Sequence, residues 1–232
     1  MTSANITPPT TPSQGIASGI FIAAAQSLYS PIIEKFRIIK DSSHPNFNKV
    51  GLVFPGPKTF KKSLQSLPFY SCKNLYFFSL YPFVKKATDG VTRSDIQSQA
   101  LAASISGFAQ NAFPLQREPH MAKTTAECLK NGVKGGAYFG SFFTAAPLIA
   151  EKLDIKEDSL KNNASLGAIA GMTAQIAENT VEGMSAAWKS GSYAKIPSLI
   201  IKNPNILRSS ATGAAFLSSL ALANKAYHKY TE

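Results

Sequence analysis

Acidic residues are scarce in this chain, and cysteine is almost absent. Its 232 residues include 24 Lys and Arg but only 13 Asp and Glu, which gives a net charge of +11. Two cysteines, Cys72 and Cys128, are too few for a disulfide framework, and no CxxC pair is present. The sequence also lacks a glycine-rich phosphate loop and a readable nucleophile–base pair. We therefore expect no enzyme activity, no metal site and no cofactor.

Six stretches contain no Asp, Glu, Lys or Arg. They cover residues 1–33, 74–84, 96–116, 135–150, 162–177 and 209–224. Extended by their flanking residues, they predict helices over 15–38, 62–85, 97–120, 132–152, 163–187 and 207–228. Each helix reaches the roughly 20 residues that cross about 30 Å of hydrocarbon. The sequence thus predicts an all-α membrane protein with six transmembrane helices, whose Ala, Gly, Ser and Phe content suits close packing or a wet cavity.

Two other classes are compatible with parts of the composition. A soluble helical domain with Ala-rich core helices is one, but residues 209–223 lack the charged stripe of a soluble surface helix. Nucleic-acid binding is the other, but no basic helix face, aromatic platform or zinc motif accompanies the positive charge, so we expect no nucleic-acid partner. Lysines gather instead in the connections, which favours anionic lipid headgroups and anionic solutes as partners.

The first 14 residues are uncharged and rich in Pro, Thr and Ser. They predict a disordered arm over 1–14 and one membrane domain over 15–228. The arm has no basic n-region and no Arg-rich amphipathic pattern, so we expect any targeting signal to be internal. The domain divides into three tandem two-helix repeats, over 15–86, 97–152 and 163–228, each with a small-residue run, a helix breaker or its replacement, and then a carboxylate.

The small-residue runs 15–19, 102–107 and 167–171 precede Pro31, Pro114 and Thr180. Together with residues 137–145 and 213–216 of the even helices, this pattern resembles the mitochondrial carrier family, and the even helices are similar to those of the ADP/ATP carrier subgroup. The resemblance covers residues 15–228 and implies three repeats of two transmembrane helices. It also implies transport by alternating access in the mitochondrial inner membrane. The outer mitochondrial membrane and the peroxisomal membrane are alternative locations for the same helix bundle.

The family signature on each odd helix is Pro-x-(Asp/Glu)-x-x-(Lys/Arg). Its proline bends the helix, and its acid and base can pair between repeats into a gate. Residues at or beside these positions here are Pro31, Glu34 and Arg37, then Pro114 and Glu118, then Thr180 and Glu182. The first acid and base lie one residue, about 100°, too far along the helix. Glu118 is also out of phase, and Thr180 replaces proline, so we expect no complete three-pair gate.

A second gate lies on the even helices of the family. The matching positions here pair Phe78 with Tyr81, Phe143 with Ala146, and Leu222 with Lys225, of which Lys225 alone keeps its charge. We therefore expect closure on that side to depend on apolar packing.

Candidate solute contacts are polar residues within or beside the apolar helices: Gln65, Lys73, Lys134 and Arg208. A charge inside a membrane segment is a functional candidate because its burial in lipid is costly. Lys134 and Arg208 can also be interpreted as residues at helix ends whose charged groups reach the membrane–water interface. Lys73 lies mid-segment and is the stronger candidate. A Lys–Glu pair involving Glu34, Glu178 or Glu182 is plausible on the same grounds.

Two functions follow from these patterns. The first is a carrier-like protein that moves an anionic metabolite or nucleotide by alternating access, in contact with an anionic, cardiolipin-like lipid. The second is a carrier-derived adaptor, anchor or insertion factor that no longer transports and binds a membrane-protein partner. The eroded signatures and the short chain favour the second, and the small-residue packing and Lys73 favour the first.

Overall fold

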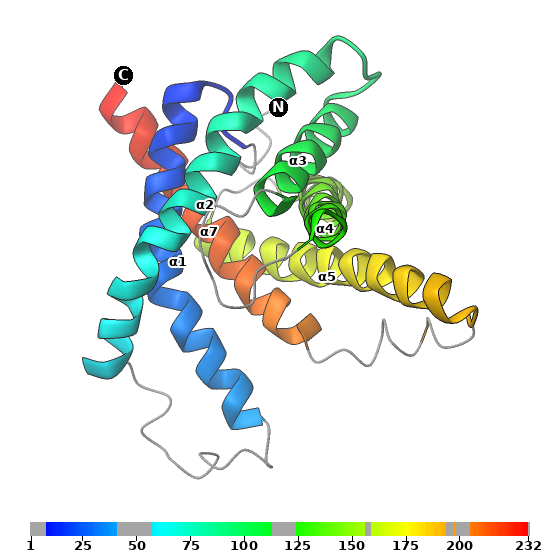
Figure 1. The fold of residues 1–232 in the computed structure, drawn as a ribbon. Helices are drawn as coiled ribbons and strands as arrows, with labels where there is room; N and C mark the ends of the chain where they lie inside the picture. Colours follow the sequence, from blue (N-terminus) through cyan, green and yellow to red (C-terminus); the bar gives the residue numbers. More distant parts are fainter. Residues whose placement is uncertain are drawn as a thin grey trace.

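Figure 1 shows the chain in a computed structural model, which describes residues 8–40, 57–112, 124–155, 159–193, 197 and 205–231. Six long helices account for this part of the chain: α1 (Pro12–Lys40), α2 (Pro57–Asp89), α3 (Asp95–Ala112), α4 (Thr125–Lys152), α5 (Leu160–Ser190) and α7 (Asn205–Thr231). The all-α prediction is therefore confirmed. Each observed helix overlaps one predicted helix, while the predicted continuation of α3 beyond 112 lies outside the described residues.

The six helices form a closed ring. Each helix packs against the next one along the chain, and α7 packs back against α1. Consecutive helices form the three hairpins α1/α2, α3/α4 and α5/α7, and the interfaces α2/α3, α4/α5 and α7/α1 join one hairpin to the next. Three two-helix units thus enclose one interior.

Within each hairpin, glycines bring the two helices into backbone contact. A Cβ atom added to Gly167 would lie 2.2 Å from the carbonyl oxygen of Gly213, and one added to Gly15 would lie 2.2 Å from that of Phe78. In the second hairpin a Cβ on Gly107 would lie 2.7 Å from the carbonyl oxygen of Gly135. Only a hydrogen atom fits at such separations, which are typical of helix pairs packed through small residues.

Local signals set several helix ends. Thr124 and Glu127 form a capping box at the start of α4, and the Ser159 hydroxyl accepts the Asn162 N–H at the start of α5. α5 ends at Gly191, whose φ of 69° is left-handed and therefore suits glycine. α1 begins at Pro12, so this helix includes the last three residues of the predicted arm.

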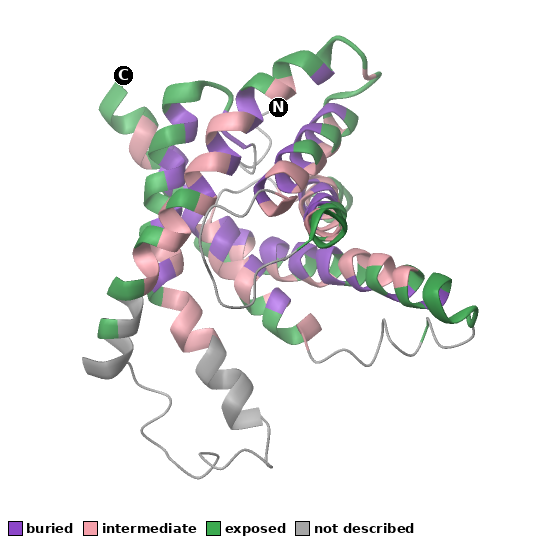
Figure 2. Cartoon of the chain, in the orientation of Figure 1, coloured by how far each residue is buried: buried purple, intermediate pink, exposed green. Residues whose placement is uncertain are grey.

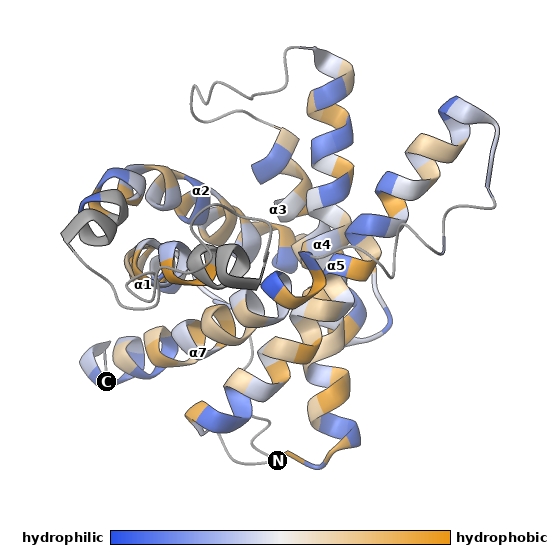
Figure 3. Cartoon of the chain, turned by 90° about the horizontal axis from the view of Figure 1, so that it is seen from below, coloured by the Kyte–Doolittle hydropathy of each residue, from blue (hydrophilic) through white to orange (hydrophobic). Residues whose placement is uncertain are grey.

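Apolar and polar side chains share the interior, and large apolar side chains also lie on the outside. Figure 2 shows buried residues along the inward faces of the helices, and many of them are polar: Ser18, Ser27, Asn74, Ser98, Gln99, Ser106, Gln110, Asn163, Gln175, Asn179, Ser209, Ser219 and Asn224. Figure 3 shows that hydrophobic positions are scattered along the helices. Large apolar side chains are exposed on every helix, among them Ile16, Ile20, Phe21, Leu28, Leu64, Phe83, Leu101, Ile105, Leu148, Ile169, Ile176, Leu207 and Leu222. Water is a poor solvent for such an exterior, and hydrocarbon is a good one.

Two helices are long and apolar enough, by length and composition, to cross a membrane. These are the segments Pro12–Ile33 of α1 and Asn205–Thr231 of α7. They lie side by side in the ring, since α7 packs against α1. Composition alone therefore assigns two candidate spans among the described residues, next to each other.

Candidate functional site

The most charged contact between helices lies between α4 and α5. Lys134 Nζ lies 3.3 Å from Glu178 Oε1 and 3.2 Å from Glu182 Oε2, and Lys130 Nζ lies 4.0 Å from Glu182 Oε1. Glu178 and Glu182 are one turn apart on α5, so a single lysine can reach both carboxylates. The predicted Lys–Glu pairing is present here, and it joins the second hairpin to the third.

Next to this cluster, Gln175 joins α5 to α7. Its Nε2 donates to Asn179 Oδ1 at 2.9 Å and to Glu178 Oε2 at 3.3 Å, and its Oε1 accepts a bond from the Ser209 hydroxyl. Gln175, Asn179 and Ser209 are all buried. Since buried polar groups are costly without partners, this network holds α5, α7 and the charged cluster in one arrangement.

The other two hairpins carry a glutamine at the equivalent place. On α1, Gln26 Oε1 accepts a bond from Asn74 Nδ2 of α2 at 2.7 Å. On α3, Gln110 Nε2 donates to the Lys73 carbonyl oxygen of α2 at 2.6 Å. These glutamines precede Pro31 by five residues and Pro114 by four, and Gln175 precedes Thr180 by five. We call Gln26, Gln110 and Gln175 the glutamine layer.

The even helices supply an aromatic layer, which lies in the C-terminal halves of α2 and α4 and near the middle of α7. It consists of buried rings from α2, α4 and α7: Phe77, Phe78, Tyr81, Phe142, Phe143 and Phe216. Phe78 lies 6.1 Å from Phe216 and Phe142 lies 5.5 Å from Phe216, centroid to centroid. Phe77 stacks on Phe143 at 6.0 Å. The three hairpins thus meet through packed rings, which fill the interior at this level.

The structure places the predicted even-helix gate in two environments. Phe78, Tyr81, Phe143 and Ala146 are all buried, and the first three belong to the aromatic layer. The third pair, Leu222 and Lys225, is exposed, whereas Phe216, Leu217 and Leu220 and the neighbouring Ala221, Ala223 and Asn224 are buried. The sequence alignment to the family did not fix the rotation of this last helix, because its small residues surround it almost evenly.

The predicted solute contacts are not brought together at one site. Gln65 and Arg208 are exposed. Lys73 is half-buried, with its Nζ 5.9 Å from the centre of the Phe69 ring, so its ammonium group lies over an aromatic face. Lys134 is in the α4/α5 cluster described above. Of these four residues, only Lys73 and Lys134 are partly buried; Lys73 lies on α2 and Lys134 on α4.

The predicted signature residues are described in part. Pro31 is half-buried within α1, Thr180 donates its hydroxyl to the Ile176 carbonyl oxygen at 2.8 Å, and Glu182 pairs with Lys134. Glu34 and Arg37 are in α1, but their side chains lie outside the described part of the structure, as do Pro114 and Glu118 altogether. Glu182 is the one acid of the signature whose partners can be named, and both partners are on α4.

Sequence reasoning missed the glutamine layer. A glutamine inside an apolar helix has no charge to mark it, and its role depends on which face it occupies. The sequence does contain one signal for it, because each glutamine lies four or five residues before Pro31, Pro114 or Thr180.

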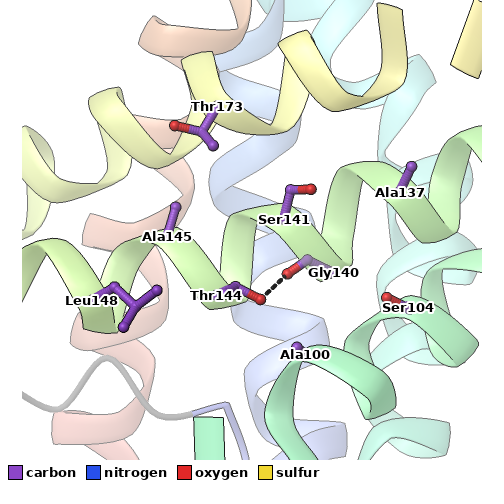
Figure 4. Close-up of a pocket in the computed structure, with 9 residues that line it drawn as sticks. All are labelled: Ala100, Ser104, Ala137, Gly140, Ser141, Thr144, Ala145, Leu148 and Thr173. Carbon is purple, nitrogen blue, oxygen red and sulfur yellow. Dashed lines mark hydrogen bonds between the residues drawn. The ribbon is translucent and has the colours of Figure 1, made fainter. Parts of the chain in front are cut away.

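A shallow groove lies between α3, α4 and α5, and Figure 4 shows the nine side chains around it. Its volume is about 410 Å³, and its lining is mostly small: Ala100, Ser104, Ala137, Gly140, Ser141, Thr144, Ala145, Leu148 and Thr173. The hydroxyls of Thr144 and Thr173 donate to carbonyl oxygens of their own helices, Gly140 and Ile169. The groove offers an apolar surface and no charged group.

Within the described ranges, no three His, Cys, Asp or Glu side chains are grouped so that they could hold a metal ion. No protein-family model, curated protein or solved structure matches this chain. The glutamine layer, together with the partly exposed α4/α5 cluster that Gln175 contacts through Glu178, is the candidate functional site.

Proposed function

We propose that this chain is a six-span membrane protein that moves a small anionic solute through the interior of its helix ring. The observation that carries the proposal is a combination: amide and hydroxyl side chains are buried among apolar ones, and large apolar side chains are exposed on all six helices. In a bilayer this arrangement satisfies both surfaces, since lipid contacts the apolar exterior and polar groups face one another or a water-filled path.

The order of the helices supports a carrier-like mechanism. Three hairpins in a closed ring, each with one member of the glutamine layer, fit the approximate threefold repetition that the family resemblance implies. A solute that reaches the glutamine layer meets amide groups from all three hairpins. The aromatic layer lies beyond it and closes the interior on the other side. Alternating access then requires the aromatic layer to open while the glutamine end closes.

An anion is the solute class that the charge favours. The net charge of +11 raises the local concentration of anions, and Lys73 and Lys134 carry cationic groups beside the polar interior. The same charge favours anionic lipids of the cardiolipin type around the bundle, and the family resemblance points to the mitochondrial inner membrane.

A non-transporting adaptor is the second candidate, and one contact favours it. The Lys134 ammonium group already has two carboxylates within 3.3 Å, so its charge is matched by the protein itself. A side chain held in this way stabilises the α4/α5 interface and contributes little to solute binding.

Solute uptake into liposomes distinguishes the two candidates. The purified protein would be reconstituted in vesicles that contain cardiolipin and tested with labelled nucleotides, phosphate and carboxylates. Lys73→Ala is the test variant, and Lys61→Ala is its matched control because Lys61 is an exposed lysine on the same helix. We expect saturable uptake of one solute, retained in the control and strongly reduced in Lys73→Ala. A folded protein that takes up none of these solutes would instead support the adaptor.

A further inference from the structure

α5 is longer than a membrane span. Its 31 residues, Leu160–Ser190, extend over roughly 46 Å at 1.5 Å per residue, whereas hydrocarbon is about 30 Å thick. Figure 1 shows the C-terminal end of α5 (gold) projecting away from the other helices. If the span begins near Leu160, the last two to three turns lie at or beyond the lipid headgroups.

The projecting end has one apolar, exposed face. Met184 and Trp188 are one turn apart, with 57% and 82% of their surface exposed, and Tyr193 just after the helix is 58% exposed. On the opposite face Gly183 and Ala187 are buried. The exposed Lys189 follows Trp188 directly. Trp, Tyr and Lys together at the end of a span are typical of the membrane–water interface, where each can place its apolar part in lipid and its polar part in water.

The charge of this part of the chain fits an anionic surface. From residue 183, near the end of α5, to residue 208, at the start of α7, the sequence contains no Asp or Glu, while it contains four basic residues: Lys189, Lys195, Lys202 and Arg208. Each lysine or arginine near an anionic leaflet strengthens binding to it, and no acidic residue in this stretch opposes that attraction. A protein partner with an apolar groove would not require such a one-sided charge.

We propose that the surface formed by Met184, Trp188, Lys189 and Tyr193 lies in the headgroup region of an anionic leaflet and fixes the end of α5 there. The surface anchors the third hairpin at the bilayer. The inference rests on the membrane-spanning part of the proposed function and does not depend on transport.

Trp188 is the only tryptophan in the chain, so its fluorescence reports on this surface alone. The full-length protein would be reconstituted in phosphatidylcholine vesicles, with or without phosphatidylglycerol, and insertion would be checked by flotation in alkaline carbonate. Lipids brominated near the headgroup or near the chain end would quench the fluorescence by depth, and acrylamide would quench from the water phase.

We expect blue-shifted emission, stronger quenching by the shallow bromines than by the deep ones, and weak quenching by acrylamide. Adding phosphatidylglycerol should increase the blue shift. The matched control is Trp188→Phe combined with Ile169→Trp, since Ile169 is exposed mid-helix on α5 and should respond most to the deep bromines.

Two results would overturn the inference while leaving the membrane span intact. In one, the inserted protein shows red emission and strong acrylamide quenching, which would place Trp188 in water. In the other, Trp188 is shielded from acrylamide and from both brominated lipids, which would mean that protein covers it. Failure of the chain to float with the vesicles would instead contradict the proposed function itself.

Discussion

The interfaces within a hairpin differ in kind from the interfaces between hairpins. Within α5/α7 the backbones touch, because Gly167 faces Gly213 with no room for a side chain. Between α4 and α5 the contact is made by long side chains, Lys134 with Glu178 and Glu182. Backbone contact through glycine has one geometry, whereas lysine and glutamate can keep a bond over a range of helix positions.

The same contrast holds elsewhere in the ring. Between α2 and α3, Lys85 pairs with Asp95, the hydroxyls of Thr88 and Ser98 bond to each other, and Gln110 donates to the Lys73 carbonyl oxygen. Between α1 and α7, Gln14 donates to Asn224 at 3.2 Å. We therefore expect the hairpins to behave as rigid units and the side-chain bonds between them as adjustable joints. A carrier needs this division, because alternating access moves packed units against one another without unfolding them.

The largest test of this division is a side chain placed inside a hairpin. In Gly213→Val the new Cβ would lie 2.2 Å from the Gly167 carbonyl oxygen, and backbone cannot give way as a flexible side chain can. We expect a loss of at least about 3 kcal/mol in the free energy of unfolding, or failure to fold. Thermal unfolding in detergent would measure it.

Gly90→Ala is the matched control for that substitution. Gly90 is exposed between α2 and α3, and the nearest atom to an added Cβ is the Ala87 carbonyl oxygen at 3.7 Å, an ordinary contact. We expect its unfolding temperature to equal that of the parent. If Gly213→Val unfolded like Gly90→Ala, the hairpins would not be rigid units, and the comparison with the joints between them would fail.

Much of the helical layout could be predicted from the sequence, because a long stretch without charged residues indicates an apolar helix regardless of which helices pack against it. The site could be predicted only in fragments. Lys134 was a candidate solute contact or helix-end residue, but its two carboxylate partners depend on how α4 and α5 are rotated. Gln65, chosen as a solute contact, proved exposed for the same reason. Helices with small residues on all sides give no periodic signal from which that rotation can be predicted.

An effect of intermediate size is expected at the α4/α5 joint. Lys134→Met removes the cation and leaves Glu178 and Glu182 one turn apart with like charge. We expect a loss of about 1–2 kcal/mol, less than for a fully buried pair because all three side chains keep some exposure to solvent. The unfolding temperature of the purified variant would measure it.

The control for this joint restores the charge balance. Lys134→Met combined with Glu178→Gln and Glu182→Gln should recover most of the loss, since the unpaired carboxylates are then removed as well. Lys161→Ala, an exposed lysine at the other end of α5, should change nothing. A loss in Lys134→Met that the triple variant does not recover would mean that Lys134 acts through packing and not through charge.

The smallest effect is expected at the α2/α3 joint. Lys85 Nζ pairs with Asp89 and, at 2.8 Å, with Asp95, but both carboxylates are largely exposed, so water and salt weaken the bonds.

The hydrogen bond from Lys85, helped by one from Ser98, lowers the pKa of Asp89 below its ordinary value of 3.8. A lowered pKa in the folded state stabilises the protein above the pKa of the unfolded chain, and this contribution is lost as the pH falls through the folded value. Lys85→Ala should therefore lower the unfolding temperature slightly at neutral pH and low salt. Parent and variant should converge in high salt, and also as the pH falls through the folded pKa of Asp89, which lies below 3.8. A difference that persists under both conditions would show that Lys85 joins α2 and α3 through packing and not through charge.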